Sequence, residues 1–85
     1  MNPMDKITEE VMGEVQYAIT MYPKFNSCHE GFSVLKEEVD ELWDEVKVKQ
    51  GKRSREALRK EALQVAAMAI RFIHDLTQDE AGAQR

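Results

Sequence analysis

Apolar residues recur at every third or fourth position along most of the chain, which predicts amphipathic helices rather than strands. The first such segment starts at Asn2-Pro3, a typical helix opening, and is ended by Pro23. Its apolar face consists of Ile7, Val11, Val15, Ala18 and Tyr22. We expect one helix between Pro3 and Pro23.

A second helix is predicted to begin at the capping box Ser27-Cys28-His29-Glu30. In this motif the Ser and Glu side chains can each accept a hydrogen bond from a free backbone N–H. Apolar residues then alternate spacings of three and four, as in a heptad seam. They are Phe32, Leu35, Val39, Leu42 and Val46. The pattern predicts a helix that continues to Gly51, because glycine commonly terminates helices.

Ser54 can cap a third helix. Its apolar seam consists of Leu58, Ala62, Val65, Ala69, Phe72 and Leu76. Because only a short turn separates the two long helices, they should form an antiparallel hairpin with facing seams. Trp43, Ile70 and Ile73 lie outside or at the edge of these seams. The first helix and a second subunit would cover them.

The predicted fold is therefore all-α: a three-helix chain whose four-helix-type bundle is completed by oligomerisation. A chain of 85 residues suggests one domain, which we place at residues 1–78. Residues 79–85 have little apolar content and are expected to fray. A core of this size gives limited stability by itself, so a homodimer or homotetramer is expected.

Composition narrows the possible partners and the setting. The net charge of −4 argues against general nucleic-acid binding. The single cysteine, Cys28, cannot form an internal disulfide, which suits a reducing cytosol. No apolar run approaches the length of a membrane span, and no signal-peptide apolar stretch is visible. We expect a soluble, cytoplasmic protein without membrane contact.

The segment from Glu37 to Glu45 carries a cluster of carboxylates on a helix that must also pack. At 100° per residue, Glu38 and Glu41 share one flank, and Glu38 is the nearer to the apolar seam. Glu61 and Gln64 lie on one side of the third helix. An antiparallel hairpin can bring the two pairs together, and their oxygen atoms are the type of ligand that Mg²⁺ prefers.

A purely structural interpretation is also open. Acid-rich helices often present a solvated face, as expected for Glu37, Asp40 and Asp44. Glu38 could also form an ion pair with Arg59 or Lys60, with no metal involved.

Two motifs carry a resemblance to a known family. The sequences Leu35-Lys36-Glu37-Glu38-Val39-Asp40-Glu41-Leu42 and Glu61-Ala62-Leu63-Gln64-Val65 resemble the MazG-like, all-α nucleoside triphosphate pyrophosphohydrolases, which carry EExxE on one helix and ExxD on the next. The resemblance covers about residues 27–76, and residues 29–75 also look like small phage and bacterial nucleotide pyrophosphohydrolases. It implies an obligate oligomer that cleaves an NTP or dNTP to the monophosphate and pyrophosphate, with Mg²⁺ as cofactor (Mn²⁺ is a second option).

By the same resemblance, Glu38, Glu41 and Glu61 would be metal ligands, and Glu37 or Glu41 would orient or deprotonate the attacking water. Gln64 stands where the family has Asp. Its amide oxygen can coordinate a metal without adding charge, so we expect weaker Mg²⁺ binding than with four carboxylates. The alternative is a non-catalytic helical oligomerisation or interaction module that keeps the fold and has a degraded metal site.

Residues for substrate binding are predicted less specifically. The hairpin end is basic, and Arg59 or Lys60, close to Glu61, are the candidates for contacting phosphate. A solvated turn explains the other basic residues, since no aromatic residues alternate with them to stack on bases. Phe25, His29 and Trp43 could line a base pocket or could be ordinary core or cap residues.

Overall fold

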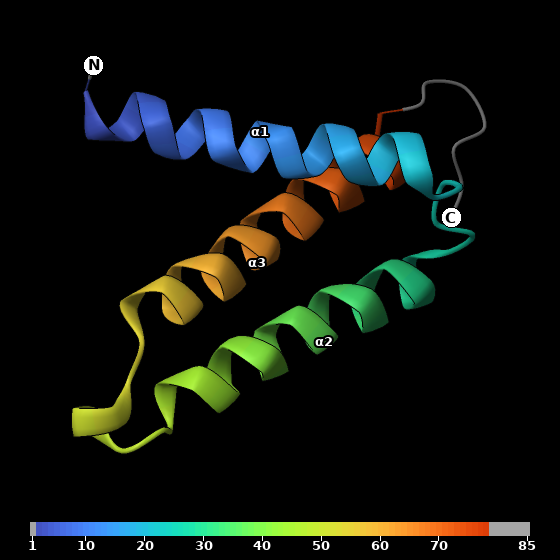
Figure 1. The fold of residues 1–85 in the computed structure, drawn as a ribbon. Helices are drawn as coiled ribbons and strands as arrows, with labels where there is room; N and C mark the ends of the chain where they lie inside the picture. The colour runs from blue at the N-terminus through green and yellow to red at the C-terminus, as the bar shows by residue number, and fades with distance from the viewer. Residues whose placement is uncertain (1, 79–85) are drawn as a thin grey trace.

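The computed structural model describes residues 2–78 and contains three α-helices (Figure 1). They are α1 (Pro3–Met21), α2 (Cys28–Val46) and α3 (Arg55–Leu76), with a short 3₁₀ helix, η1 (Gln50–Lys52), between the last two. No strand occurs among the described residues, which confirms the all-α prediction. None of these helices combines the length and hydropathy needed to cross a membrane. The tail predicted to fray, residues 79–85, lies outside the described residues.

The predicted caps form at all three helix starts. The Asn2 side chain accepts a hydrogen bond from the Met4 N–H at 2.7 Å, while Ser27 and Ser54 each accept one at 3.1 Å. These bonds satisfy N–H groups that have no partner inside the helix. The capping box differs in one detail, because Glu30 accepts from the backbone N–H of Asn26, at 2.6 Å. Glu30 therefore holds the preceding loop as well as the helix start.

The end of α2 was predicted too late in the chain. The helix ends at Val46, and the N–H of Lys47 makes the closing bond to the Trp43 carbonyl. Lys49 has non-helical backbone angles, φ −51° and ψ 133°, which break the helical path before Gly51 is reached. Gly51 instead lies inside η1. The basic turn thus begins earlier than the apolar pattern indicates.

The three helices are arranged with α3 in the middle. It packs against α2, as the second arm of the predicted antiparallel hairpin, and against α1. Helices α1 and α2 do not pack against each other, and Figure 1 shows them on opposite sides of α3. The central helix is therefore the one on which residues from both neighbours converge.

Small side chains let these helices approach closely. The core cluster joins Val11, Val15 and Ala18 of α1 to Ala67 and Met68 of α3. At the other interface, a Cβ atom on Gly31 of α2 would lie 2.8 Å from side-chain atoms of both Leu76 and Phe72. Glycine suits this contact because any larger residue would force the Leu76 and Phe72 side chains, or α2 itself, to move.

The apolar seam predicted for α2 is only partly correct. Leu35 and Leu42 are half-buried, but Phe32, Val39 and Val46 are exposed, with exposed fractions of 59%, 44% and 36%. Compared with the predicted seam, the side of α2 that faces α3 is rotated, so that it includes Gly31 and Glu38. The rotation places a carboxylate in the interface and leaves large apolar side chains on the outside. Assembly into an oligomer, which would cover them, stays a prediction.

Candidate metal centre

Three carboxylates from two helices meet in the α2–α3 hairpin. Each of Glu38, Glu41 and Glu61 offers one oxygen atom that lies within 4.8 Å of the other two. Glu38 and Glu41 share a face of α2 because they are three residues apart, and the antiparallel hairpin brings Glu61 opposite them. Glu38 and Glu61 are half-buried, whereas Glu41 is exposed. The structure thus brings together the three residues that the helical spacing singled out.

The electrostatics of this carboxylate cluster are unbalanced. Burial raises the pKa of Glu38, and the neighbouring carboxylates of Glu41, Glu61 and Glu37 raise it further. No Lys or Arg of residues 2–78 forms an ion pair with a member of the cluster. Like charges held together disfavour ionisation until a cation or a proton compensates them. The ion-pair explanation of Glu38 is therefore wrong: Arg59 pairs with Glu10 of α1 instead.

The cluster fits a hard divalent cation. An octahedral Mg²⁺ shell has metal–oxygen distances of about 2.1 Å, so two opposite ligands are about 4.2 Å apart. Adjacent ligands are about 3.0 Å apart, and at most one pair among three ligands is opposite. The glutamate oxygens lie within 4.8 Å of one another, so small side-chain movements would bring them onto the ion. Glu38, Glu41 and Glu61 are the residues that would hold the ion. Carboxylates accommodate Mn²⁺ as well as Mg²⁺.

Gln64 connects the cluster region to α1. It lies one turn after Glu61 and is half-buried. Its amide nitrogen donates a hydrogen bond to the carboxylate of Glu14. This bond fixes the side chain between α1 and α3, a role that the sequence did not predict. Whether Gln64 also ligates a metal stays a prediction.

The other predicted catalytic and phosphate-binding residues lie at the surface. Glu37 is exposed and is not part of the three-carboxylate cluster, although its charge acts on Glu38. Arg59 is bound to Glu10, and Lys60 is exposed without a partner in the described part of the chain. The position of Arg59 follows from the packing of α1 on α3, which no local motif reveals.

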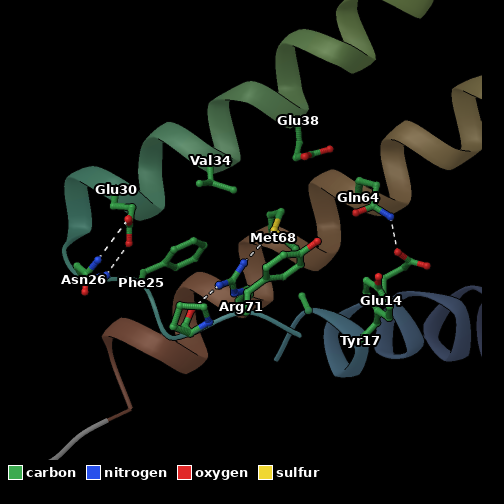
Figure 2. Close-up of a pocket in the computed structure, with 13 residues that line it drawn as sticks. Glu14, Tyr17, Phe25, Asn26, Glu30, Val34, Glu38, Gln64, Met68 and Arg71 are labelled. Carbon is green, nitrogen blue, oxygen red and sulfur yellow. Dashed lines mark hydrogen bonds between the residues drawn. The ribbon is translucent and has the colours of Figure 1, made fainter. Parts of the chain in front are cut away.

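A cavity of about 520 Å³ opens next to Glu38 (Figure 2). Its walls come from all three helices and from the α1–α2 loop. Glu38 lines it and also belongs to the carboxylate cluster, so the two features are contiguous. The lining residues are Glu14, Tyr17, Ala18, Tyr22, Pro23, Phe25, Asn26, Glu30, Val34, Glu38, Gln64, Met68 and Arg71.

Of the three aromatic or ring residues proposed for a base pocket, only Phe25 lines this cavity. Phe25 is 3% exposed. Trp43 is 58% exposed and His29 is also exposed, and neither contributes to the cavity wall. Two tyrosines take their place, Tyr17 and Tyr22, whose rings meet edge to face with centroids 6.5 Å apart.

Comparisons with known proteins add no assignment to this geometry. No protein-family model matches the sequence, and neither a curated protein nor a solved structure matches it. The MazG-like resemblance therefore stays a prediction that rests on the motif residues.

A buried charged pair on α3 was not predicted from the sequence. Arg71 and Asp75 are 6% and 5% exposed, and Arg71 Nε lies 3.4 Å from Asp75 Oδ2. Asp75 also accepts a hydrogen bond from the Phe25 N–H at 3.1 Å and contacts His74 Nδ1 at 2.8 Å. The available signal was an Arg and an Asp four residues apart within an apolar stretch.

These partners determine how Asp75 titrates. Burial alone would raise its pKa, but the bonds from His74 and from the Phe25 backbone, together with the Arg71 charge, outweigh burial and lower it. Arg71 in turn donates from Nη2 to the Pro23 carbonyl at 2.8 Å. The pair thus ties the α1–α2 loop to α3, which fixes one wall of the cavity.

Proposed function

We propose that this chain is a Mg²⁺-dependent nucleotide pyrophosphohydrolase of the MazG-like type, which cleaves an NTP or dNTP to the monophosphate and pyrophosphate. The observation that carries the proposal is the cluster of Glu38, Glu41 and Glu61, which has no cationic partner among residues 2–78 and adjoins a cavity. A volume of about 520 Å³ is within the range of small-ligand sites.

In this proposal the three glutamates hold the ion. When bound, Mg²⁺ would offset charge on phosphate oxygens and lower the pKa of a bound water. Glu41 is exposed and can therefore exchange protons with solvent, which suits it to orient or deprotonate a water molecule. Glu37, the other candidate for this role, is exposed one position before Glu38.

The test is pyrophosphate release from a panel of NTPs and dNTPs with Mg²⁺ or Mn²⁺. We expect Glu38→Gln and Glu61→Gln to lower turnover by roughly 100-fold or more, about 2.7 kcal/mol in the barrier. Asp40→Asn is the matched control, since Asp40 lies on the same helix in an exposed pair with Lys36. Turnover that survives in both glutamine variants, or that Asp40→Asn also abolishes, would contradict the proposal.

Gln64→Asp tests the missing charge. A fourth carboxylate should tighten Mg²⁺ binding, but it would also face Glu14, the present partner of Gln64. We therefore expect the gain to be clearer in the double variant Glu14→Gln with Gln64→Asp, which relieves that repulsion. Weaker Mg²⁺ binding in both variants, measured by calorimetry, would show that the neutral amide is the better group here.

The second candidate function is a non-catalytic oligomerisation module. It is favoured by Gln64, whose amide bonds to Glu14 of α1 and adds no fourth carboxylate to the cluster. The large apolar side chains that α2 leaves exposed, among them Phe32 and Trp43 at 59% and 58%, would form its interface. Apolar residues gathered on one helix are typical of interaction surfaces. This candidate predicts a homodimer or homotetramer in analytical ultracentrifugation, with no pyrophosphate release and no metal binding.

A further inference from the structure

Arg71 is a buried cation on the wall of the cavity. Its side chain is 8% exposed, yet it lines the cavity together with Phe25 and Met68 (Figure 2). Buried guanidinium groups are normally bonded at most of their five N–H donors. The acceptors of each Arg71 nitrogen therefore show which of its N–H groups has no strong hydrogen-bond partner.

The three nitrogens of Arg71 are unequally satisfied. Nη2 donates to the Pro23 carbonyl at 2.8 Å. Nη1 has only the sulfur of Met68, at 4.0 Å, which is a weak acceptor. Nε is buried without a hydrogen bond, although Asp75 Oδ2 lies 3.4 Å away. Nη1 is thus a charged donor beside the cavity without a strong acceptor.

The guanidinium is held firmly in place. The Phe25 ring lies against it, with the Arg71 Cζ atom 4.1 Å from the ring centroid, and Asp75 fixes it from α3. A donor that is immobilised before binding loses little side-chain entropy when it meets a ligand. The same arrangement excludes water from one side of the group, which strengthens any bond that it makes.

The rest of the cavity wall suits a flat heterocycle. Tyr17 lines it and is 57% exposed, so it offers aromatic surface for stacking. Tyr22, which is 54% exposed, also lines it and already faces the Arg71 guanidinium, with Cζ 5.8 Å from its ring centroid.

The carboxylates of Glu14 and Glu30 also line the cavity. Glu14 already accepts a hydrogen bond from Gln64. Glu30 accepts from Asn26. A carboxylate has about four acceptor positions, however, so each can take a further N–H group. Together with Arg71, the wall offers one cationic donor, anionic acceptors and aromatic surface.

We propose that this cavity binds the nucleobase of the substrate and that Arg71 is the residue that selects it. The inference rests on the proposed function, with the phosphates at the carboxylate cluster next to Glu38. Arg71 Nη1 donates to a ring carbonyl oxygen, and a wall carboxylate accepts the adjacent ring N–H. Uracil, thymine, guanine and hypoxanthine present that C(=O)–N(H) edge. Cytosine and adenine instead present an amino group, a donor, at the position opposite the guanidinium.

The experiment measures binding of nucleoside monophosphates without metal, so that neither turnover nor metal binding is needed. IMP and AMP form one matched pair of ligands, and UMP and CMP form another. The members of each pair differ only in whether the base carries the oxo and N–H groups or the amino group and ring nitrogen. We expect IMP over AMP and UMP over CMP by roughly 10- to 100-fold, the effect of one hydrogen bond from a charged donor.

Arg71→Lys keeps the positive charge beside Asp75 and loses the guanidinium fork, so both preferences should fall at least about 5-fold. The preference that remains comes from the wall carboxylate, which accepts the ring N–H in either protein. Circular dichroism shows whether the variant is folded. Tyr17→Ala is the control, expected to weaken all four ligands equally and to leave the ratios unchanged.

Equal binding within both pairs by the wild-type protein would overturn the assignment, as would the absence of any binding. Undiminished preferences in folded Arg71→Lys would also overturn it. If the predicted preferences appear but no triphosphate is ever cleaved, the base site stands and the proposed hydrolysis fails. Cleavage of triphosphates without any base preference would support the hydrolysis and overturn the base site.

Discussion

Asp75 and Glu38 are both acidic residues withdrawn from solvent in the α2–α3 hairpin, but their surroundings have opposite effects. Asp75 receives a backbone N–H, a histidine nitrogen and an arginine charge, and its pKa is lowered. Glu38 is surrounded by Glu41, Glu61 and Glu37, and its pKa is raised. The compensated carboxylate holds the loop to α3. The uncompensated one is left with a charge that an external cation can neutralise.

The difference separates a structural acid from a candidate functional one. Burying a carboxylate is tolerated when partners compensate for the lost hydration, as at Asp75. At Glu38 no partner from residues 2–78 compensates for it, so the fold carries a small local destabilisation. Natural proteins keep such arrangements mainly at binding and catalytic sites. The two residues can be compared directly by measuring how substitution, pH and added metal change the stability of the protein. The four predictions below run from the largest expected change to the smallest.

The largest effect is expected for Asp75→Asn. Removing the charge leaves buried Arg71 without its anionic partner. The free energy of unfolding should therefore fall by on the order of 3 kcal/mol. Urea denaturation measures the change. Asp44→Asn is the control, because the Asp44 pair with Lys47 is exposed and should contribute less than about 1 kcal/mol. Equal effects of the two substitutions would show that burial of the Asp75 pair contributes nothing.

The pH dependence of stability tests the same residue without further mutation. Because the pKa of Asp75 is lower in the folded state, its contribution is complete above the unfolded value of about 3.9 and is lost as the pH falls through the folded pKa. The stability gap between the wild type and Asp75→Asn should therefore narrow below about pH 4. A gap that stays constant down to pH 2 would contradict the lowered pKa.

Added Mg²⁺ should raise the stability of the folded protein by binding at the carboxylate cluster around Glu38, and not at Asp75. If Mg²⁺ binds with a Kd of about 1 mM, a concentration of about 10 mM stabilises the folded protein by about 1.4 kcal/mol. Thermal melts should show this increase in the wild type and in Asp40→Asn, but not in Glu61→Gln. A similar increase in Glu61→Gln would place the ion elsewhere on this acidic protein.

The smallest effect is expected for Glu38→Gln without metal, and its sign is opposite to that of Asp75→Asn. Removing one of several like charges should stabilise the fold at neutral pH by roughly 0.5 kcal/mol. Because the folded pKa of Glu38 is raised, the gain should disappear at pH values below about 4, where the glutamate is already protonated. Destabilisation at neutral pH would mean that the carboxylate is structurally required.

Much of the fold was predictable because helices depend on local rules. The caps at Asn2, Ser27 and Ser54 were identified correctly from residue type and position. The antiparallel hairpin followed from one short connection between two long periodic segments. The end of α2 was predicted too late because Gly51 is the first glycine after the apolar seam, although the helix ends at Val46 and the backbone is non-helical at Lys49.

The candidate site was predictable only in part. Helical spacing put Glu38 and Glu41 on one face and selected Glu61 as their partner, and the structure brings the three together. Of the residues considered for a base pocket, only Phe25 lines the cavity, and the rest of its lining was not predicted because its walls combine α1, a loop and two further helices. Arg71 was overlooked for the same reason, since its partners Pro23 and Phe25 are about fifty positions away in sequence.

By itself the sequence determined the three helices, their caps, the hairpin and the acids that could share a metal. The helices and caps depend on neighbours within one or two helical turns, where geometry follows from residue spacing. The hairpin and the pairing of its acids follow from the short connection between α2 and α3. Only the tertiary structure decided which side of α2 faces α3, that Gln64 bonds to Glu14, and that Arg71 is buried beside a cavity. Those features depend on how whole helices rotate and approach, which is set by packing volume and close contacts such as Gly31 against Phe72.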